Sequence, residues 1–325
     1  MKKVFLMVAA TAAMLATGFT ACKSNSPNSP DQPKDIDIYV AGYDNSGAKK
    51  VAKVWKNGKE LYSLTDGSNN ATALSVFVVG RDVYASGYDD RVAKVWKNSE
   101  ELYALTDGSK GARANSVSVA NDKVYTAGYD GAFAKLWENK TATDLTDGSK
   151  SANALSVFIA GNNVYTVGHE KNLAKVWKNG SELFALTAGS DEAGALSVFV
   201  VDEDVYTAGY KNSVTKKEAK VWKNASELFA ITGGSEDIKA YSVYVVGKDV
   251  YIAGEKGDTA KVWKNGEELY KLADDGEAYS IVVYNGDVYV AGEEGDTAKV
   301  WKNGKELYKL ANEGEAYSIF IVERK

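Results

Sequence analysis

Short apolar segments recur along the chain, each bounded by Gly, Asn or Asp residues. In the segment at 73–79 (ALSVFVV) consecutive positions are apolar, which is typical of a strand that is buried on both faces. Three further strand-like segments follow at 82–88, 92–98 and 101–105, separated by turns and one loop. Asn-Gly joins the third and fourth segments in several units, and this pair favours the type I′ turn of a tight hairpin. The pattern therefore predicts units of four antiparallel strands.

The unit is repeated seven times, and its most constant phrase is AKVWKN. Every tryptophan of the protein lies in this phrase or in its variant AKLWEN at 134–139. A period of about 40 residues built from short strands is typical of β-propeller blades. The series consists of Trp55, Trp96, Trp137, Trp177, Trp222, Trp263 and Trp301.

The two ends of the repeat region predict a closed ring. The segment at 36–43 (IDIYVAGY) matches the second strand of a unit, and the segment at 316–322 (AYSIFIV) matches the first. One strand from the C-terminal end and three from the N-terminal end would complete a blade and leave no open sheet edge. We therefore predict an all-β fold, a seven-bladed β-propeller over residues 36–325. An open β-solenoid with capping repeats is the structural alternative.

The repeat resembles known propeller classes in its general plan. The arrangement of strands is similar to that of YVTN-type and WD40-like propellers, although the WD dipeptide and the Kelch double glycine are absent. The phrases VYVAG, AKVWKNG, LTDG and A-x-S-V resemble a repeat of uncharacterised Bacteroidetes proteins. This resemblance implies the fold and no particular chemistry.

The first 22 residues have the features of a secretory signal. Lys2 and Lys3 precede an apolar stretch at 4–19 that is short for a membrane span. The following FTAC, ending at Cys22, resembles a bacterial lipobox, with Phe where Leu is usual. An ordinary signal peptide is the alternative, but the only cysteine of the protein stands where lipidation requires it. The resemblance implies a lipid anchor on Cys22.

Residues 23–35 (KSNSPNSPDQPKD) contain all three prolines and few apolar residues, which predicts a solvated tether. The resemblance to Bacteroidetes lipoproteins implies a place in the outer membrane. Because no acidic cluster follows Cys22 directly, a position facing the periplasm is favoured over the cell surface.

Composition and charge exclude several functions. A net charge of −5 argues against nucleic-acid binding, which requires a basic face. One histidine and one cysteine exclude an internal disulfide and a Cys/His zinc site. A P-loop, an HExxH motif, a nucleophile elbow and a calcium-binding loop are all absent from the sequence, so we expect neither a cofactor nor a metal. We further expect a monomer.

Residues identical in every unit are expected to serve the scaffold, because each meets the same surroundings seven times. We expect the tryptophans to pack between blades, the glycines to allow close packing, and the serines to form a ring near the axis. The glycines are Gly42, Gly87, Gly128, Gly168, Gly209, Gly254 and Gly292, and the serines are Ser75, Ser116, Ser156, Ser197, Ser242, Ser280 and Ser318.

The residues that differ between units are the candidates for recognition, and they fall mainly in loops expected on one face. The residue after the invariant glycine is Tyr43, Tyr88, Tyr129, His169, Tyr210, Glu255 or Glu293. The residue before the invariant serine is a tyrosine only in the last units, at Tyr241, Tyr279 and Tyr317. Nearby acids are Asp274, Asp275, Glu277, Glu313 and Glu315.

Tyrosines beside carboxylates suit a glycan or a cationic peptide, and a solvated acidic rim is the alternative interpretation. We therefore predict a lipid-anchored binding module whose partner is a glycan, a peptide or an envelope protein. A scaffold subunit of an envelope complex is a further alternative.

Catalysis is a rival hypothesis. Glu255 and Glu293 belong to adjacent units and could form a glycosidase-like carboxylate pair in a glycan-active hydrolase or lyase. His169 could act as a general base, but it lacks an evident nucleophile and an orienting group, and a tyrosine-to-histidine change at a repeat position is the favoured explanation. Separately, Asp-Thr-Ala at 258–260 and 296–298 resembles a Bacteroidetes O-glycosylation sequence, which implies modification of Thr259 and Thr297.

Overall fold

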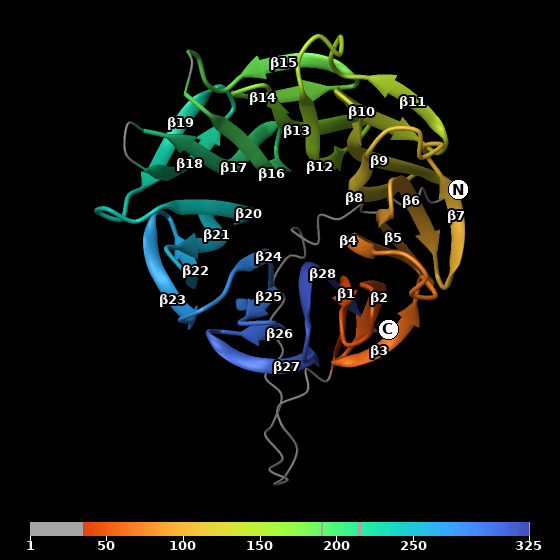
Figure 1. The fold of residues 1–325 in the computed structure, drawn as a ribbon. Coiled ribbons are helices and arrows are strands. Elements are labelled where there is room, and N and C mark those ends of the chain that lie inside the picture. Colours follow the sequence, from red (N-terminus) through yellow and green to blue (C-terminus); the bar gives the residue numbers. More distant parts are fainter. Residues whose placement is uncertain (1–34, 190, 214–215, 325) are drawn as a thin grey trace, which may run out of the picture.

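The computed structural model describes residues 35–189, 191–213 and 216–324. Within these residues the chain forms seven sheets of four antiparallel strands, which stand as blades around a ring (Figure 1). The first strand of each blade lies toward the centre, and the fourth lies at the periphery (Figure 1). The predicted all-β, seven-bladed propeller is therefore confirmed. The predicted signal peptide, Cys22 and the tether up to residue 34 lie outside the described residues.

The blades are numbered from the N-terminus, and the strands of each blade follow one another from the centre outward. Blades 1 to 4 are β28 (Gly314–Glu323), β1 (Ile36–Asp44), β2 (Val51–Lys56) and β3 (Lys59–Ser63); β4 (Ala71–Val79), β5 (Asp82–Asp89), β6 (Val92–Lys97) and β7 (Glu100–Ala104); β8 (Ala112–Ala120), β9 (Lys123–Asp130), β10 (Phe133–Glu138) and β11 (Thr141–Asp144); and β12 (Ala152–Ala160), β13 (Asn163–Glu170), β14 (Leu173–Lys178) and β15 (Ser181–Ala185). Blades 5 to 7 are β16 (Ala193–Val201), β17 (Asp204–Asn212), β18 (Lys217–Lys223) and β19 (Ser226–Ile231); β20 (Ile238–Val246), β21 (Asp249–Lys256), β22 (Thr259–Lys264) and β23 (Glu267–Ala273); and β24 (Ala278–Tyr284), β25 (Asp287–Glu294), β26 (Thr297–Lys302) and β27 (Lys305–Ala311).

Blade 1 closes the ring by joining the two ends of the described chain. β28 pairs antiparallel with β1 from Ile36 opposite Glu323 to Asp44 opposite Gly314. Beyond β28, the Arg324 backbone N–H donates to the Asp35 carbonyl oxygen at 2.8 Å, and Arg324 Nε lies 2.6 Å from Asp37 Oδ1. This closure confirms the predicted strand exchange and excludes the open solenoid.

The AKVWKN phrase is constant because each of its side chains meets a similar neighbour in most blades. In β2, Ala52 and Val54 are fully buried, and Trp55 packs into the core cluster that blades 1 and 7 form together. The first lysine, Lys53, pairs with Glu60 of the fourth strand, and the second, Lys56, pairs with Asp37 of the second strand. Such clusters confirm the predicted packing between blades for six of the seven tryptophans, Trp55, Trp96, Trp177, Trp222, Trp263 and Trp301.

The asparagine that ends the phrase fastens the hairpin to the second strand. Asn57 and Gly58 both have positive φ angles, as predicted for the Asn-Gly turn. Asn57 Oδ1 accepts a hydrogen bond from the Ile38 backbone N–H at 2.8 Å. The same bond is made by Asn98, Asn139, Asn179, Asn224, Asn265 and Asn303.

The invariant serines form a closed hydrogen-bonded ring on the innermost strands. Each Oγ accepts from the backbone N–H of the residue after the serine of the next blade, as Ser75 does from Val117 at 3.2 Å. The last bond runs from the Val76 backbone N–H to Ser318 Oγ across the closure of the ring. The other five acceptors are Ser116, Ser156, Ser197, Ser242 and Ser280. The expected serine ring thus bonds backbone and links every pair of adjacent blades.

The connections between strands define two faces of the ring. The loops between the second and third strands, and those leading from a fourth strand to the next blade, lie on one face, which we call the variable face. The short turns of the other connections lie on the opposite face. β1 runs toward the variable face, so Ile36 lies on the opposite face. In the described part of the chain, no helix is long and apolar enough to cross a membrane.

Candidate functional site

A β-bulge beside the invariant serine interrupts every innermost strand. In β4 the register with β5 shifts between Ala73 and Ser75, so Leu74 is an extra residue without a partner. A bulge changes the direction of the side chain of its extra residue. Here the extra residue is the one that precedes the invariant serine. The extra residues are Leu74, Asn115, Leu155, Leu196, Tyr241, Tyr279 and Tyr317.

The invariant glycine lies opposite this bulge, where the innermost strand comes very close. A Cβ atom on Gly128 would lie 2.0 Å from the Arg113 carbonyl oxygen, and the other six glycines have the corresponding contact at 1.9 or 2.0 Å. A side chain cannot be accommodated at that distance, so close packing explains the glycine, as predicted. The bulge and the glycine together place a variable side chain at the same point in every blade.

Three bulge tyrosines stack in sequence across blades 6, 7 and 1. The ring centroids of Tyr241 and Tyr279 are 5.4 Å apart, and those of Tyr279 and Tyr317 are 4.9 Å apart. Tyr43, which follows the invariant glycine of blade 1, extends the series at 6.1 Å from Tyr317. These separations fall in the range of favourable tilted aromatic contacts.

Four carboxylates accompany the stacked tyrosines. The Tyr43 hydroxyl donates to Glu315 Oε1 at 2.5 Å, and the Tyr279 hydroxyl donates to Glu315 Oε2 at 3.1 Å and to Glu293 Oε1 at 3.4 Å. Glu255 is 6% exposed and accepts from Lys239 Nζ at 2.6 Å. We call this set the acid–tyrosine wall: Tyr43, Tyr241, Tyr279, Tyr317, Glu255, Glu277, Glu293 and Glu315.

Burial changes the protonation of the wall. Loss of solvent raises the pKa of Glu293 to about 7, with further contributions from the carboxylates of Glu315, Glu277 and Asp296 that outweigh the hydrogen bond from Tyr279. Burial and the neighbouring Glu277 also raise the pKa of Glu255, and the attraction of Lys239 only partly opposes this. Nothing in the sequence indicates these raised pKa values, because they arise from the packing of neighbouring blades.

The tyrosines of the wall stay neutral. Burial, followed by the nearby carboxylates, holds the pKa of each hydroxyl well above its ordinary value. Each hydroxyl therefore remains a hydrogen-bond donor over the physiological pH range. The wall consists of neutral donors beside carboxyl groups, two of which lose their protons only near neutrality.

The remaining candidates on the variable face lie in blades 2 to 5. Tyr88 is near enough to the wall to contribute to the raised pKa of Tyr43 and of Tyr317. Among the described residues, no hydrogen bond or ring contact joins the wall to Tyr129, His169 or Tyr210. Tyr88 carries the Arg113 guanidinium over its ring at 4.6 Å, and the Tyr210 hydroxyl donates to Glu192 at 2.9 Å. Tyr129 is half-buried at the end of β9. Burial lowers the pKa of His169, and no nucleophile is recorded in contact with it. The structure thus divides the predicted series into a clustered part and a dispersed part.

Other predicted positions lie at the edge of the variable face. Asp274, Asp275 and Glu313 are exposed in the loops that lead into β24 and β28. Thr259 and Thr297 open β22 and β26 and are half-buried. Their O-glycosylation stays a prediction.

Sequence reasoning missed Lys239. It occupies the position two residues before the bulge tyrosine, which is Glu277 in blade 7 and Glu315 in blade 1. Its Nζ donates to Glu255 and, at 3.2 Å, to the Tyr241 hydroxyl. Alignment of all seven units two positions before the bulge residue would have marked it as one of two cations at this position, the other being Arg113 in blade 3.

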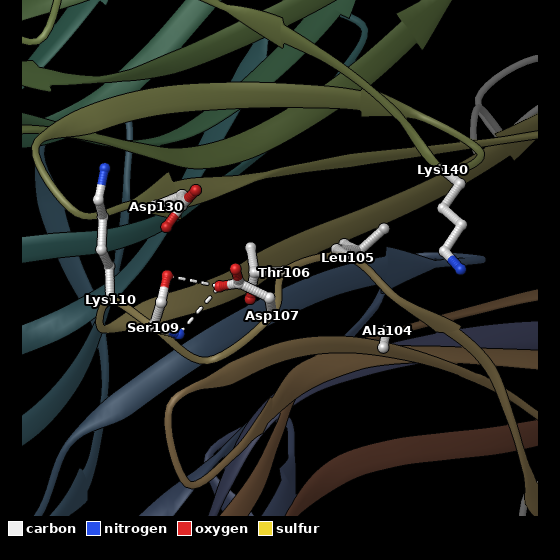
Figure 2. Close-up of a pocket in the computed structure, with 8 residues that line it drawn as sticks. All are labelled: Ala104, Leu105, Thr106, Asp107, Ser109, Lys110, Asp130 and Lys140. Carbon is white, nitrogen blue, oxygen red and sulfur yellow. Dashed lines mark hydrogen bonds between the residues drawn. The ribbon is translucent and has the colours of Figure 1, made fainter.

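A separate cavity of about 630 Å³ lies along the seam between blades 2 and 3 (Figure 2). Its lining combines exposed groups of opposite charge, and Asp107 Oδ1 accepts from the backbone N–H of Ser109 at 2.9 Å and from its hydroxyl at 2.6 Å. None of the residues predicted for recognition lines it. We base the candidate site on the wall, whose groups are buried or half-buried and are joined by hydrogen bonds and ring contacts. The cavity is lined by Ala104, Leu105, Thr106, Asp107, Ser109, Lys110, Asp130 and Lys140.

No group of three or more His, Cys, Asp or Glu side chains within the described ranges is arranged to hold a metal ion.

Comparison with known proteins identifies the architecture and no family. No protein-family model and no curated protein matches the sequence. The fold is similar to that of a provisionally named 6-phosphogluconolactonase from Bacteroides uniformis ATCC 8492, with a TM-score of 0.56 and 12% identity, covering 89% of this chain and 99% of that one. A protein of the same provisional name from Bacteroides fragilis NCTC 9343 matches with a TM-score of 0.52 and 15% identity, covering 91% and 100%. At such identities the similarity shows the fold alone.

Proposed function

We propose that the protein is a lipid-anchored binding module of a bacterial cell envelope and that its ligand contacts the acid–tyrosine wall. The wall itself carries this proposal. Blades 6, 7 and 1 bring four stacked tyrosines and four carboxyl groups together, whereas the bulge positions of the other blades hold leucine or asparagine. A scaffold made of nearly identical units gains such a local concentration of aromatic and acidic groups only where the units differ.

The chemistry of the wall indicates the ligand classes. Tyrosine rings offer apolar faces for sugar rings or extended side chains, and carboxyl groups fix hydroxyl and amino groups by hydrogen bonds. A glycan, a peptide or a segment of an envelope protein fits this description. If the partner is a large protein, the module would act as a scaffold subunit of an envelope complex.

The direction of β1 supports a consistent orientation at a membrane. Its first residue, Ile36, lies on the opposite face, and its last residues reach the variable face beside Tyr43. A lipid on Cys22 would therefore hold the ring by its opposite face, and the wall would point away from the membrane. We propose that this membrane is the outer membrane and that the module faces the periplasm.

We expect Cys22→Ala to abolish incorporation of a labelled fatty acid and to move the protein from the membrane fraction to the soluble fraction. The thiol is the only group of its kind in the chain and the acceptor that lipidation requires. Metabolic labelling followed by fractionation measures both effects. Unchanged labelling in the variant would contradict the anchor and leave the binding proposal standing.

We expect one ligand class to raise the melting temperature of the protein, and Tyr279→Ala to abolish this effect. A ligand present at 100 times its Kd stabilises the folded state by about 2.7 kcal/mol, which corresponds to a rise of roughly 5–10 °C. The panel comprises host and dietary glycans, cell-wall fragments, basic peptides and calcium, each added to the full chain in a thermal-shift assay. Tyr279 is the chosen position because it contacts Tyr241, Tyr317, Glu293 and Glu315.

Tyr129→Ala is the matched control, because Tyr129 also lies on the variable face but has no recorded contact with the wall. It is expected to retain the ligand-dependent shift. A shift that survives in Tyr279→Ala, or is lost equally in both variants, would overturn the assignment of the site.

A second candidate function is hydrolysis or lyase chemistry on a glycan. The raised pKa of Glu293 favours it, since a carboxyl group that titrates near 7 can serve as an acid or a base. The two structurally similar Bacteroides proteins are named as enzymes, which is consistent with an enzymatic function for this fold. The double variant Glu255→Gln/Glu293→Gln separates the two functions, because loss of turnover with retained binding identifies an enzyme.

A further inference from the structure

Blades 6, 7 and 1 present three versions of one subsite. In each blade it is made by the residue two positions before the bulge tyrosine, the bulge tyrosine itself, and the residue after the invariant glycine. In blade 6 these are Lys239, Tyr241 and Glu255. In blade 7 they become Glu277, Tyr279 and Glu293, and in blade 1 Glu315, Tyr317 and Tyr43.

The blade 6 subsite is filled by the protein's own ammonium group. Lys239 Nζ lies 2.6 Å from Glu255 Oε1, 3.2 Å from the Tyr241 hydroxyl and 5.6 Å from the Tyr241 ring centroid. Its side chain is 26% exposed, and that of Glu255 is 8% exposed. A primary ammonium group on an alkyl chain is thus already bound there by a carboxylate, a hydroxyl and an aromatic face.

A lysine also lies over Tyr43, the tyrosine at the blade 1 end of the wall. Lys50 Nζ stands 3.9 Å from the centroid of the Tyr43 ring. The built-in cations therefore stand at the two ends of the tyrosine series, and Tyr279 and Tyr317 lie between them. Within the described ranges, no ion pair is recorded for Glu277, Glu293 or Glu315.

This middle part contrasts with the outer strands, where lysines have carboxylate partners. In β26, Lys299 pairs with both Glu294 and Glu306, and Lys302 pairs with Asp287. Burial and the neighbouring carboxylates of Glu315 and Glu277 favour the protonated form of Glu293 up to a pKa of about 7. An incoming cation would neutralise the same charge without the proton.

We propose that the middle of the wall, in blades 7 and 1, binds a primary alkylammonium group in the manner in which blade 6 binds the Lys239 ammonium. The ligand is a lysine side chain of a peptide or one end of a free diamine, since the two share this group. The inference rests on the proposed function and names the ligand class of that site. Glu293 and Glu315 supply the charge, Tyr279 and Tyr317 the ring faces, and Glu277 stands where blade 6 has its own cation.

Calorimetric titration of the full chain in detergent, at pH 8 and low salt, tests the proposal with three probes. These are 1,5-diaminopentane, the peptide acetyl-Gly-Lys-Gly-amide, and the same peptide with its lysine side chain acetylated. We expect the first two, or one of them, to bind and the acetylated peptide to bind at least 10-fold more weakly. Binding of the diamine alone assigns a free amine, and binding of the lysyl peptide alone assigns a protein segment. Equal binding of acetylated and free peptide would overturn the proposal.

Glu277→Lys is the decisive variant, because it gives blade 7 the internal ammonium group that blade 6 has. It should lower affinity for the amine probes at least 10-fold. Asp275→Lys makes the same change of charge at an exposed loop position two residues away, and it should change affinity less than twofold. If the two variants lost equal amounts of affinity for the amine probes, the effect would come from the overall charge of the face, and the subsite would be refuted.

The proposal also fixes the pH dependence of binding. Groups facing Glu293 are Glu277 of the loop before β24, Tyr279 of β24, Glu315 of β28 and Asp296 of the loop before β26. Because the pKa of Glu293 is about 7, its carboxyl group is neutral at pH 5 and charged at pH 8, so amine affinity should rise between these values. An amine affinity that does not change with pH would count against the subsite.

Two outcomes distinguish this inference from the proposed function. If the amine probes do not bind, but a glycan raises the melting temperature and Tyr279→Ala abolishes that rise, this inference is wrong and the proposed binding module stands. If no ligand class binds, both proposals are wrong.

Discussion

Deletion of residues 314–325 is expected to leave the chain without a stable ring. The deletion removes β28, which is both the innermost strand of blade 1 and the partner of β1 along nine residue pairs. Ile319 and Ile321 are 4% and 6% exposed, and full burial of each stabilises the fold by about 1.5–3 kcal/mol. Together with the lost strand pairing, this is comparable to the net stability of a typical domain, about 5–15 kcal/mol.

Circular dichroism during thermal unfolding and size-exclusion chromatography measure the outcome. We expect no cooperative transition above room temperature and association through the exposed edge of β1. A chain that ends at Glu323 is the matched control, since it keeps β28 and loses only Arg324, with its bonds to Asp35 and Asp37, and Lys325. A cooperative transition in the longer deletion, close to that of the control, would show that six complete blades suffice.

Gly128→Ala is expected to lower the free energy of unfolding by about 3 kcal/mol or more. The new methyl group would lie 2.0 Å from the Arg113 carbonyl oxygen and 3.0 Å from the Trp137 ring, so the paired strands of blade 3 must separate. Forcing extra atoms into a packed region costs about 1–3 kcal/mol, and a backbone obstacle places this change at the upper end. For a domain of this size the melting temperature should fall by roughly 6–12 °C.

Gly47→Ala provides the control in chemical or thermal denaturation. Gly47 lies in the loop between β1 and β2, and a Cβ atom there would meet nothing within 4 Å. Its effect should stay within about 0.5 kcal/mol. A loss of stability in Gly128→Ala no larger than this would show that the bulge can shift to make room.

The ring and its closure could be predicted because they follow from local patterns that repeat. The constant AKVWKN phrase, the Asn-Gly turns and the strand types at the two ends determine the number of blades and their strand order. The serine positions predicted a ring, and the structure adds that each Oγ accepts from the neighbouring blade, as Ser75 does from Val117. A spacing in sequence states which residues are equivalent, but it does not state which atoms of adjacent blades meet.

The candidate site could be predicted only in part. The tyrosines at 241, 279 and 317 stood out because they replace the leucine or asparagine of other units. The β-bulge that directs them was not visible, since the extra residue has no signature of its own in the sequence. The raised pKa of Glu293 was likewise hidden, because it depends on burial and on Glu315, which lies three strands further along the chain in the neighbouring blade.

The role of Lys239 shows the same limit. In the sequence it is one of many lysines. Its role as a bound cation is visible only in the structure, where Glu255 and Tyr241 contact its ammonium group. The register within blade 6 places Lys239 opposite Glu255, but the sequence does not show that the ammonium group meets both the carboxylate and the Tyr241 hydroxyl.

The position of β1 has a mechanical consequence. This one strand runs from Ile36 on the opposite face to Tyr43 in the wall, and it is paired along its length with β28 on one side and β2 on the other. Tension between a ligand held at the wall and the N-terminal end of β1 is directed along the strand. The hydrogen bonds to both neighbours then share the load in shear, whereas a force across the sheet would break them one at a time. If the proposed ligand and lipid anchor are correct, β1 would carry the force between them along its own length.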